Sequence, residues 1–290
     1  MHDHIIAVDN EIKTLLSQKL SDLENLLQSD VLFFCSPIYS TLEIFYRDLI
    51  EDIQNKGTSN ERLTVILDTP GGDVITVEKL ANINRHFYKE VDFIVPESAM
   101  SAGTVFCLSG DKIYMEYTSS LGPIDPQIFS PKQNRWLPAL GYIDQMNEAI
   151  QKSRSGTLSE AEFLLLKDLE YAFLKECEQH MQLTVQLVKD WLVRYKFKTW
   201  NTHRKDGKPV TIQEKTQRAE DIANKLNDYK LWCTHGRFID IMKLREVLHL
   251  HIDDYAHLKW RIPLREYIAL AKSYISRNQF QNFFQTRHYV

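Results

Sequence analysis

The chain has 290 residues, of which 43% are apolar and 26% charged, so it is long and apolar enough to bury a large core. Its 35 Lys and Arg against 39 Asp and Glu leave a formal charge of -4, which argues against a protein whose main task is binding a phosphate backbone. The four cysteines lie far apart without a CxxC pair, so neither a zinc knuckle nor a disulfide framework is predicted.

Helical and strand patterns alternate from residue 11 to residue 115. Apolar side chains at three- and four-residue steps predict helices, and short β-branched runs predict strands. In chain order the predicted elements are a helix at 11–28, a strand at 31–35, a helix at 41–53, a strand at 63–67, a helix at 77–87, a strand at 91–95, a helix at 104–109 and a strand at 112–115. Such alternation is typical of an α/β fold with a largely parallel, covered sheet.

The middle of the chain, residues 142–200, is almost entirely helical in pattern. A helix is expected from about residue 158, with a buried stripe of Phe163, Leu166, Leu169, Ala172 and Phe173. Between Arg194 and Arg218 the chain has eight basic and two acidic residues. We interpret this stretch as a solvated face, because aromatic residues for base stacking are few there, with a patch for an anionic partner as the alternative.

Targeting signals are lacking in the sequence. No stretch approaches the roughly 20 apolar residues that cross a bilayer, and the N-terminus lacks the basic-then-apolar order of a signal peptide. We therefore expect a cytoplasmic protein that has no membrane or nucleic-acid partner.

Two loops contain the residue types that acyl transfer requires. In the first, DTPGGD at 68–73, two glycines let the backbone turn sharply after a strand and expose amides that suit an oxyanion. In the second, AMSAGT at 99–104, Ser101 stands between a strand and an apolar helix, which is the setting of a nucleophile elbow. The alternatives are a plain tight turn in the first loop and close packing of small residues in the second.

Four motifs occur in a fixed order: DTPGGD at 68–73, VPESAMSAGT at 95–104, DKIYM at 111–115 and SLGPIDPQ at 120–127. They resemble the ClpP-class serine peptidases, and within that class the serine dehydrogenase proteinase family, relatives of signal peptide peptidase A. A weaker similarity follows at 232–250. The resemblance implies a ClpP/crotonase-like spiral core at 30–255, with an N-terminal helical extension at 1–29 and a helical C-terminal tail at 256–290.

The resemblance also implies site residues and an activity. Ser101 matches the nucleophile, and the amides of Gly72 and Ala102 match the oxyanion hole. The residues expected to bind substrate beside them are Gly71, Asp73 and Met100. The implied activity is that of a serine endopeptidase acting through an acyl-enzyme, with no cofactor and no metal. A crotonase-type acyl-CoA enzyme is disfavoured, because it would not need a serine on the elbow.

The general base is where the sequence departs from its relatives. The ClpP branch has a histidine in the stretch that here reads LGPIDPQ, where Asp125 stands near the expected position. Signal-peptide-peptidase relatives use a lysine, and residues 133–149 contain none. We predict His235 as the base, oriented by Asp125 or Asp240, because imidazole exchanges protons near neutral pH. A histidine that only caps the following helix is the alternative.

Partners are also implied by the resemblance. Members of this class usually form closed rings or trimers, so we expect a homo-oligomer that takes peptide or protein substrates, with an ATPase or regulatory partner if access is narrow. The stripe from Ile12 to Leu27 and the aromatic tail from Tyr267 offer apolar surface for such contacts, or fold back on their own subunit. The functional alternative is a catalytically silent scaffold that keeps the fold and binds peptide or a partner protein.

Overall fold

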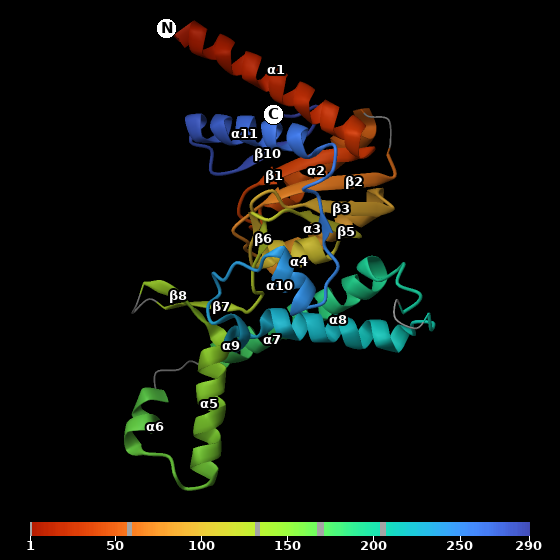
Figure 1. The fold of residues 1–290 in the computed structure, drawn as a ribbon. Helices are drawn as coiled ribbons and strands as arrows, with labels where there is room; N and C mark the ends of the chain where they lie inside the picture. The colour runs from red at the N-terminus through yellow and green to blue at the C-terminus, as the bar shows by residue number, and fades with distance from the viewer. Residues whose placement is uncertain (1, 57–59, 131–133, 167–170, 204–206) are drawn as a thin grey trace.

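The centre of the molecule is a six-stranded sheet with the order β10-β1-β2-β3-β5-β9 (Figure 1). The computed structural model describes residues 2–56, 60–130, 134–166, 171–203 and 207–290. The parallel strands are β1 (Asp30–Cys35), β2 (Arg62–Asp68), β3 (Glu90–Ile94), β5 (Lys112–Met115) and β9 (Asp253–Asp254), and β10 (Phe283–Gln285) runs antiparallel to β1. The predicted α/β fold with a mostly parallel sheet is confirmed.

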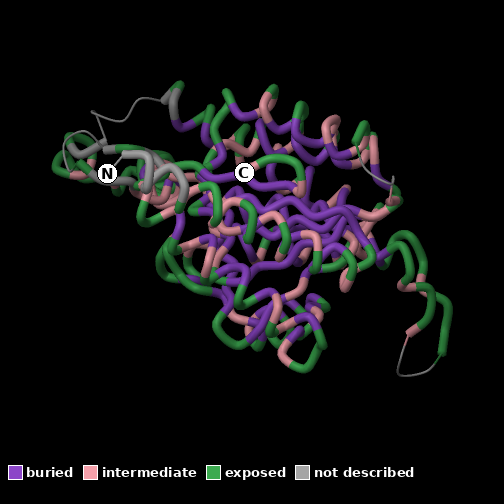
Figure 2. Tube along the Cα trace, turned by 90° about the horizontal axis from the view of Figure 1, so that it is seen from above, coloured by how far each residue is buried: buried purple, intermediate pink, exposed green. Residues whose placement is uncertain are grey.

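Helices cover both faces of this sheet. The covering helices are α1 (His2–Leu27), α2 (Leu42–Lys56), α3 (Val74–Phe87), α4 (Ala102–Leu108) and α11 (Arg261–Asn278). Beyond α4 lie α7 (Tyr171–Trp191), α8 (Ile212–Asn227), α9 (Tyr229–Trp232) and α10 (Ile241–Glu246) (Figure 1). Side chains alternate across a strand, so Leu32 and Phe34 join the core under α2, α3 and α4, while Val31 and Phe33 join the core under α1 and α11. Figure 2 shows the buried strands running through the middle of the molecule, with exposed segments around them.

Two short strand pairs and a helical arm complete the chain. β4 (Ser98–Ala99) pairs with β6 (Ser120–Leu121), and β7 (Gln127–Ser130) pairs with β8 (Arg135–Pro138). α5 (Ala139–Arg154) and α6 (Glu160–Leu166) project away from the sheet, and α7 returns to it and ends in the π-helical turn η1 (Leu192–Lys196) (Figure 1). None of the described helices is both long and apolar enough to span a bilayer.

The predicted buried stripe in this region is wrong at two of its five positions. Phe163 is 59% exposed, and Ala172 is exposed as well. The reason is that the arm carries α6 away from the sheet, so no core lies against Phe163 (Figure 1). Leu169 lies outside the described residues. Helical periodicity was therefore present, but periodicity alone does not reveal whether a helix has anything to pack on.

The N-terminal helix and the C-terminal tail pack against each other on one face of the sheet. Leu16, Leu20 and Leu23 of α1 share a core with Leu264 and Tyr267 of α11, and α1 and α11 lie side by side in Figure 1. The tail then adds β10 to the edge of the sheet. Both segments therefore fold back on their own subunit, which was the alternative to exposure at an oligomer contact.

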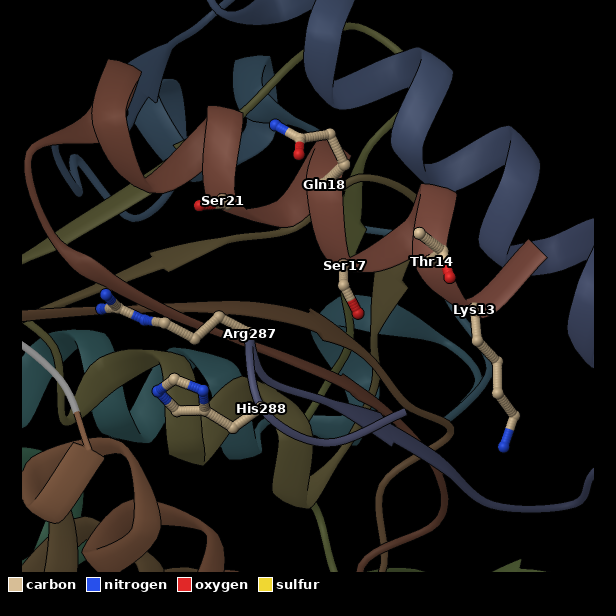
Figure 3. A pocket seen from close by; sticks show the side chains of 7 residues that line it. All are labelled: Lys13, Thr14, Ser17, Gln18, Ser21, Arg287 and His288. Atoms are coloured by element: carbon tan, nitrogen blue, oxygen red, sulfur yellow. The ribbon is translucent and has the colours of Figure 1, made fainter. Parts of the chain in front are cut away.

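A groove of about 490 Å³ separates α1 from the last residues of the chain. Figure 3 shows Ser17 and Ser21 of α1 together with Arg287 and His288 of the tail. Arg287, which lines this groove, forms two ion pairs. Its Nη2 lies 2.6 Å from Asp30 Oδ1, and its Nε lies 3.1 Å from Glu24 Oε2. Both carboxylates are buried, so this arginine holds the tail against β1 and α1.

Arg287→Met should lower the free energy of unfolding by about 3 kcal/mol, because it leaves two buried carboxylates without their cation. Burial raises the pKa of Glu24 from 4.5 to about 7, against the opposing effect of Arg287. Glu24 therefore weakens folding of the wild-type protein as the pH rises from 4.5 to about 7. Without Arg287 the folded-state pKa of Glu24 lies higher still, so the extra loss in the variant should grow as the pH rises above about 7. Urea unfolding at several pH values would measure this.

Arg277→Met is the matched control, since Arg277 pairs with Asp9 at a more exposed position of the same tail. Its cost should stay below about 1 kcal/mol. Equal costs for the two variants would mean that the Arg287 cluster does not fasten the tail.

Candidate active site

Ser101 lies on a sharp turn between strand and helix. β4 ends at Ala99 and α4 begins at Ala102, and Ser101 between them has φ 53° and ψ -119°. A positive φ at a residue other than glycine is strained by about 1–3 kcal/mol, and such strain is typical of a nucleophile elbow. The side chain is partly exposed, and its hydroxyl forms no hydrogen bond within the described ranges. The hydroxyl is therefore free to meet a ligand.

The two loops that the sequence singled out lie against each other. The Thr69 amide donates to Ser98 O at 2.9 Å, and the Met100 amide donates to Thr69 O at 3.0 Å. Gly71, which has φ +100°, lies so close to the elbow that a Cβ added to it would be 2.8 Å from the Cβ of Ser101. Gly71 is therefore required both by its backbone conformation and by the space beside the elbow.

Two backbone amides beside Ser101 have no partner among the described residues. They belong to Gly72 and to Ala102, the first residue of α4, whose amide has no acceptor within the helix. A Cβ on Gly71, the residue before Gly72, would lie 3.2 Å from the Ala102 nitrogen, so the two amides are close neighbours. Two free donors beside a free hydroxyl can stabilise the oxyanion of a tetrahedral intermediate.

The structure brings His235 and Asp125 together. His235 Nδ1 lies 2.8 Å from Asp125 Oδ1, and Asp125 is 1% exposed. The approach is fixed by Leu121 and Ile239, whose backbones exchange two hydrogen bonds of 3.0 and 2.9 Å. Asp240 instead caps α10, accepting from the Lys243 amide at 2.9 Å. Asp125 is thus the partner of His235, and the cap of the following helix is Asp240 and not His235.

The segment that holds Asp125 also touches the elbow. A Cβ on Gly122 would lie 3.2 Å from the Ser101 nitrogen and 2.7 Å from Met100 Cε. The Thr104 hydroxyl links the same parts, because it donates to the Ala99 carbonyl at 2.8 Å and accepts from the Gly122 amide at 2.9 Å. The segment that leads to Asp125, and through Asp125 to His235, therefore lies against the elbow.

The residues expected to bind substrate have different surroundings. Gly71 and Met100 lie beside Ser101 and Gly122, as described above. Asp73 is the N-cap of α3: its carboxylate accepts from the amides of Ile75 and Thr76 at 3.1 and 3.0 Å. That carboxylate is used to begin a helix, and the Asp73 amide is also engaged, since it donates to Ile38 O at 2.8 Å.

Sequence reasoning missed two polar residues at this site. Gln127 Nε2 donates to Asp125 Oδ2 at 2.7 Å, so the carboxylate has a second partner besides His235. Lys272 of α11 pairs with Asp68 and lies 3.2 Å from Glu97, which ties the tail to both loops. Although burial opposes it, the Asp68 carboxylate raises the pKa of Lys272 above its ordinary value. Gln127 lies within a motif already identified, whereas no local signal points to Lys272.

Together the parallel sheet and the elbow at the carboxyl ends of its strands define an α/β protein of the ClpP-like class. The chain belongs to the ClpP-like SDH-type serine proteinase family, whose model matches residues 4–209. The matched part contains Ser101, Gly72, Ala102 and Asp125. His235 lies beyond it.

Two proteins of Methanocaldococcus jannaschii are similar to this chain, and both are named as uncharacterized. MJ0137 is 25% identical over 200 residues, which cover 67% of this chain and 65% of that protein. MJ1495 is 26% identical over 220 residues, which cover 76% of this chain and 62% of that protein. The chain therefore spans less than two thirds of the length of each relative.

Solved structures show weaker similarity. A variant of the 1510-N membrane-bound stomatin-specific protease in complex with a substrate peptide is 15% identical, with a TM-score of 0.44 over 78% of this chain and 75% of that one. ClpP1 from Listeria monocytogenes is 9% identical, with a TM-score of 0.42 over 77% of this chain and 90% of that one.

Proposed function

We propose that this protein is a serine endopeptidase that cleaves peptides or proteins through an acyl-enzyme on Ser101. The observation that carries the proposal is the 2.8 Å contact between His235 and the buried Asp125, on segments adjacent to the elbow. A histidine whose Nδ1 is held by a carboxylate presents Nε2 as its basic nitrogen. Such a pair is the usual means of activating a serine hydroxyl.

In the proposed reaction Ser101 Oγ attacks the scissile carbonyl carbon while its proton passes to His235 Nε2. The carbonyl oxygen becomes an oxyanion, to which the amides of Gly72 and Ala102 donate. The tetrahedral intermediate then expels the amine, which takes the proton from His235, and leaves an ester on Ser101. Water, deprotonated by the same histidine, hydrolyses the ester and restores the serine. The proposed chemistry uses side chains and backbone groups only.

The free hydroxyl of Ser101 also favours an enzyme that is latent in the state that the structure describes. Since it forms no hydrogen bond to His235, the two groups must approach before proton transfer, and catalytic hydrogen bonds often tighten only when substrate binds. We propose a homo-oligomer that is latent until a substrate, an ATPase or another regulatory partner binds. A catalytically silent scaffold that binds peptide is the competing function, and it has the same free serine.

A fluorophosphonate probe with mass spectrometry of the adduct tests the proposed base. His235→Ala should slow labelling of Ser101 by about a thousandfold, and Asp125→Asn by a comparable factor, because the imidazole loses the carboxylate that fixes its tautomer. His251→Ala is the matched control, since His251 is exposed and pairs with Asp253 away from the elbow. It should label at the wild-type rate.

The labelling results distinguish His235 as the base from another base and from a catalytically silent scaffold. Labelling of Ser101 that survives both His235→Ala and Asp125→Asn would assign the base to another group. No labelling of the wild-type protein, with or without a peptide substrate, would favour the silent scaffold.

A further inference from the structure

A cavity of about 970 Å³ lies at the opposite end of the sheet from Ser101. Its floor is formed by the first residues of β2, β3 and β5, and its walls by η1, the turn that follows η1, and residues 249–253. Because these strands are parallel, their amino ends lie at this cavity while the loops with Gly72 and Ser101 follow their carboxyl ends. The cavity is therefore separate from the candidate active site.

Two carboxylates in the cavity already have cationic partners. Glu90 accepts from Arg62 Nε at 2.9 Å. Asp111 is 2.7 Å from Arg85 and 2.5 Å from Lys198. Their negative charge is compensated within the protein, so neither calls for a cation from solution.

Two lysines in the cavity have no such partner. The ammonium groups of Lys112 and Lys196 form neither an ion pair nor a hydrogen bond with any group that the structure describes, and Lys112 is exposed to solvent. Lys196 is partly buried, and loss of hydration lowers its pKa to about 8. Asp253, Asp92 and Asp111 attract Lys196 from a distance, but none of them forms an ion pair with it. A positive charge withdrawn from water without a direct partner is costly, and an anion from solution could supply that contact.

Asp92 supplies an unpartnered polar atom in the same cavity. It is 3% exposed, and its Oδ1 has no hydrogen-bond partner among the described residues. Burial raises the pKa of Asp92 to about 6. Asp92 is paired with Lys112 in the register of β3 and β5, so the two residues occupy neighbouring positions on adjacent strands. An unsatisfied buried oxygen of this kind fits a hydroxyl or amino group of a ligand.

The remaining wall is aromatic. Phe197 and Trp200 follow η1, with ring centroids 5.5 Å apart, and both line the cavity. π-Helical turns are rare and occur mostly at functional sites. Apolar rings beside convergent polar groups are the usual composition of a small-molecule site.

We propose that this cavity binds a small organic anion, a carboxylate or a phosphate ester, through Lys112 and Lys196. Asp92 contacts a hydroxyl or amino group of the same ligand, and Trp200 covers its apolar part. The basic stretch between Arg194 and Arg218 is thus in part the wall of a binding site rather than only a solvated face. The proposal is independent of the peptidase chemistry.

Isothermal titration calorimetry of the full chain, with inorganic phosphate and with succinate as separate probes, tests the proposal. At least one should bind with a single saturable site, and the one that binds identifies the anion class. Lys196→Met should weaken that binding about tenfold or more, since hydrogen bonds to charged groups are worth about 1.5–3 kcal/mol. The fold should tolerate it, because methionine replaces an unpaired, poorly hydrated charge with an apolar side chain of similar length.

Lys56→Met removes the same charge from an exposed position of α2, where Lys56 pairs with Asp52, and should leave the affinity unchanged. Lys112→Met gives an independent second variant and should also weaken binding. Two results would overturn the proposal: neither probe binds, or both lysine variants bind the anion as tightly as the wild-type protein does.

Discussion

Ser101→Ala should abolish peptide hydrolysis and fluorophosphonate labelling, with a loss of activity of roughly 10⁴-fold or more. The serine hydroxyl forms no hydrogen bond with the described residues, so its removal should change the free energy of unfolding by less than about 0.5 kcal/mol. The measurements are hydrolysis of an unstructured protein substrate and urea unfolding of the same samples. Loss of activity at unchanged stability would separate a chemical role from a structural one.

Ser120→Ala is the matched control, because Ser120 is a buried serine in β6, next to the segment that holds Gly122. It should keep its activity. Ser101→Gly gives a further readout: it should be inactive yet up to about 1 kcal/mol more stable than Ser101→Ala, since glycine adopts φ 53° without strain. Full hydrolysis by purified Ser101→Ala would refute the assignment of the nucleophile.

The part of the fold that could be predicted from the sequence is the part encoded by local pattern. The strands at β1, β2, β3 and β5 are short apolar runs bounded by turn residues, and each was expected within two residues of its observed ends. The two loops were also visible, because glycine and small residues directly after a strand are a local signal. Ser101 and Gly72 needed no long-range information.

The parts that could not be predicted depend on contacts between distant segments. β10 completes the sheet beside β1, although Phe283–Gln285 is too short and too far from β1 to be recognised as its partner. Lys272 meets Asp68 across 204 positions of the chain. Phe163 shows the converse error, since its helical pattern is real but the arm leaves it exposed. Periodicity describes a face, and only packing determines what covers it.

His235 could be predicted from the sequence only in part. Its chemistry made it a candidate, but its partner was left open between Asp125 and Asp240 because both are acidic residues within plausible reach. Hydrogen bonding separates them: Asp240 uses its carboxylate to cap α10, whereas Asp125 Oδ1 lies 2.8 Å from His235 Nδ1. The segment containing His235 lies outside the part of the chain that matches the family model. Its proposed role therefore rests on geometry, and the labelling experiment tests it.

Gly72→Val should lower the free energy of unfolding by more than about 4 kcal/mol and abolish hydrolysis. Gly72 has φ +147°, and a Cβ there would lie 1.9 Å from Ile38 O. That oxygen accepts the Asp73 amide at 2.8 Å, and the Ile38 amide donates to Gly71 O at 2.8 Å, so a side chain would separate two bonded segments. Gly72→Ala should show most of the same loss, because the Cβ alone causes the clash. Urea unfolding measures the effect.

Gly236→Ala is the control for the loss of a glycine beside a proposed site residue. A Cβ on Gly236 meets no atom within 4 Å, so the change should alter stability by less than about 0.5 kcal/mol and leave hydrolysis intact. A Gly72→Ala protein that unfolds like the wild type would mean that the loop can move away from Ile38. If that protein also hydrolysed peptides normally, the Gly72 amide would not be a donor to the oxyanion, because the substitution moves this amide together with the loop.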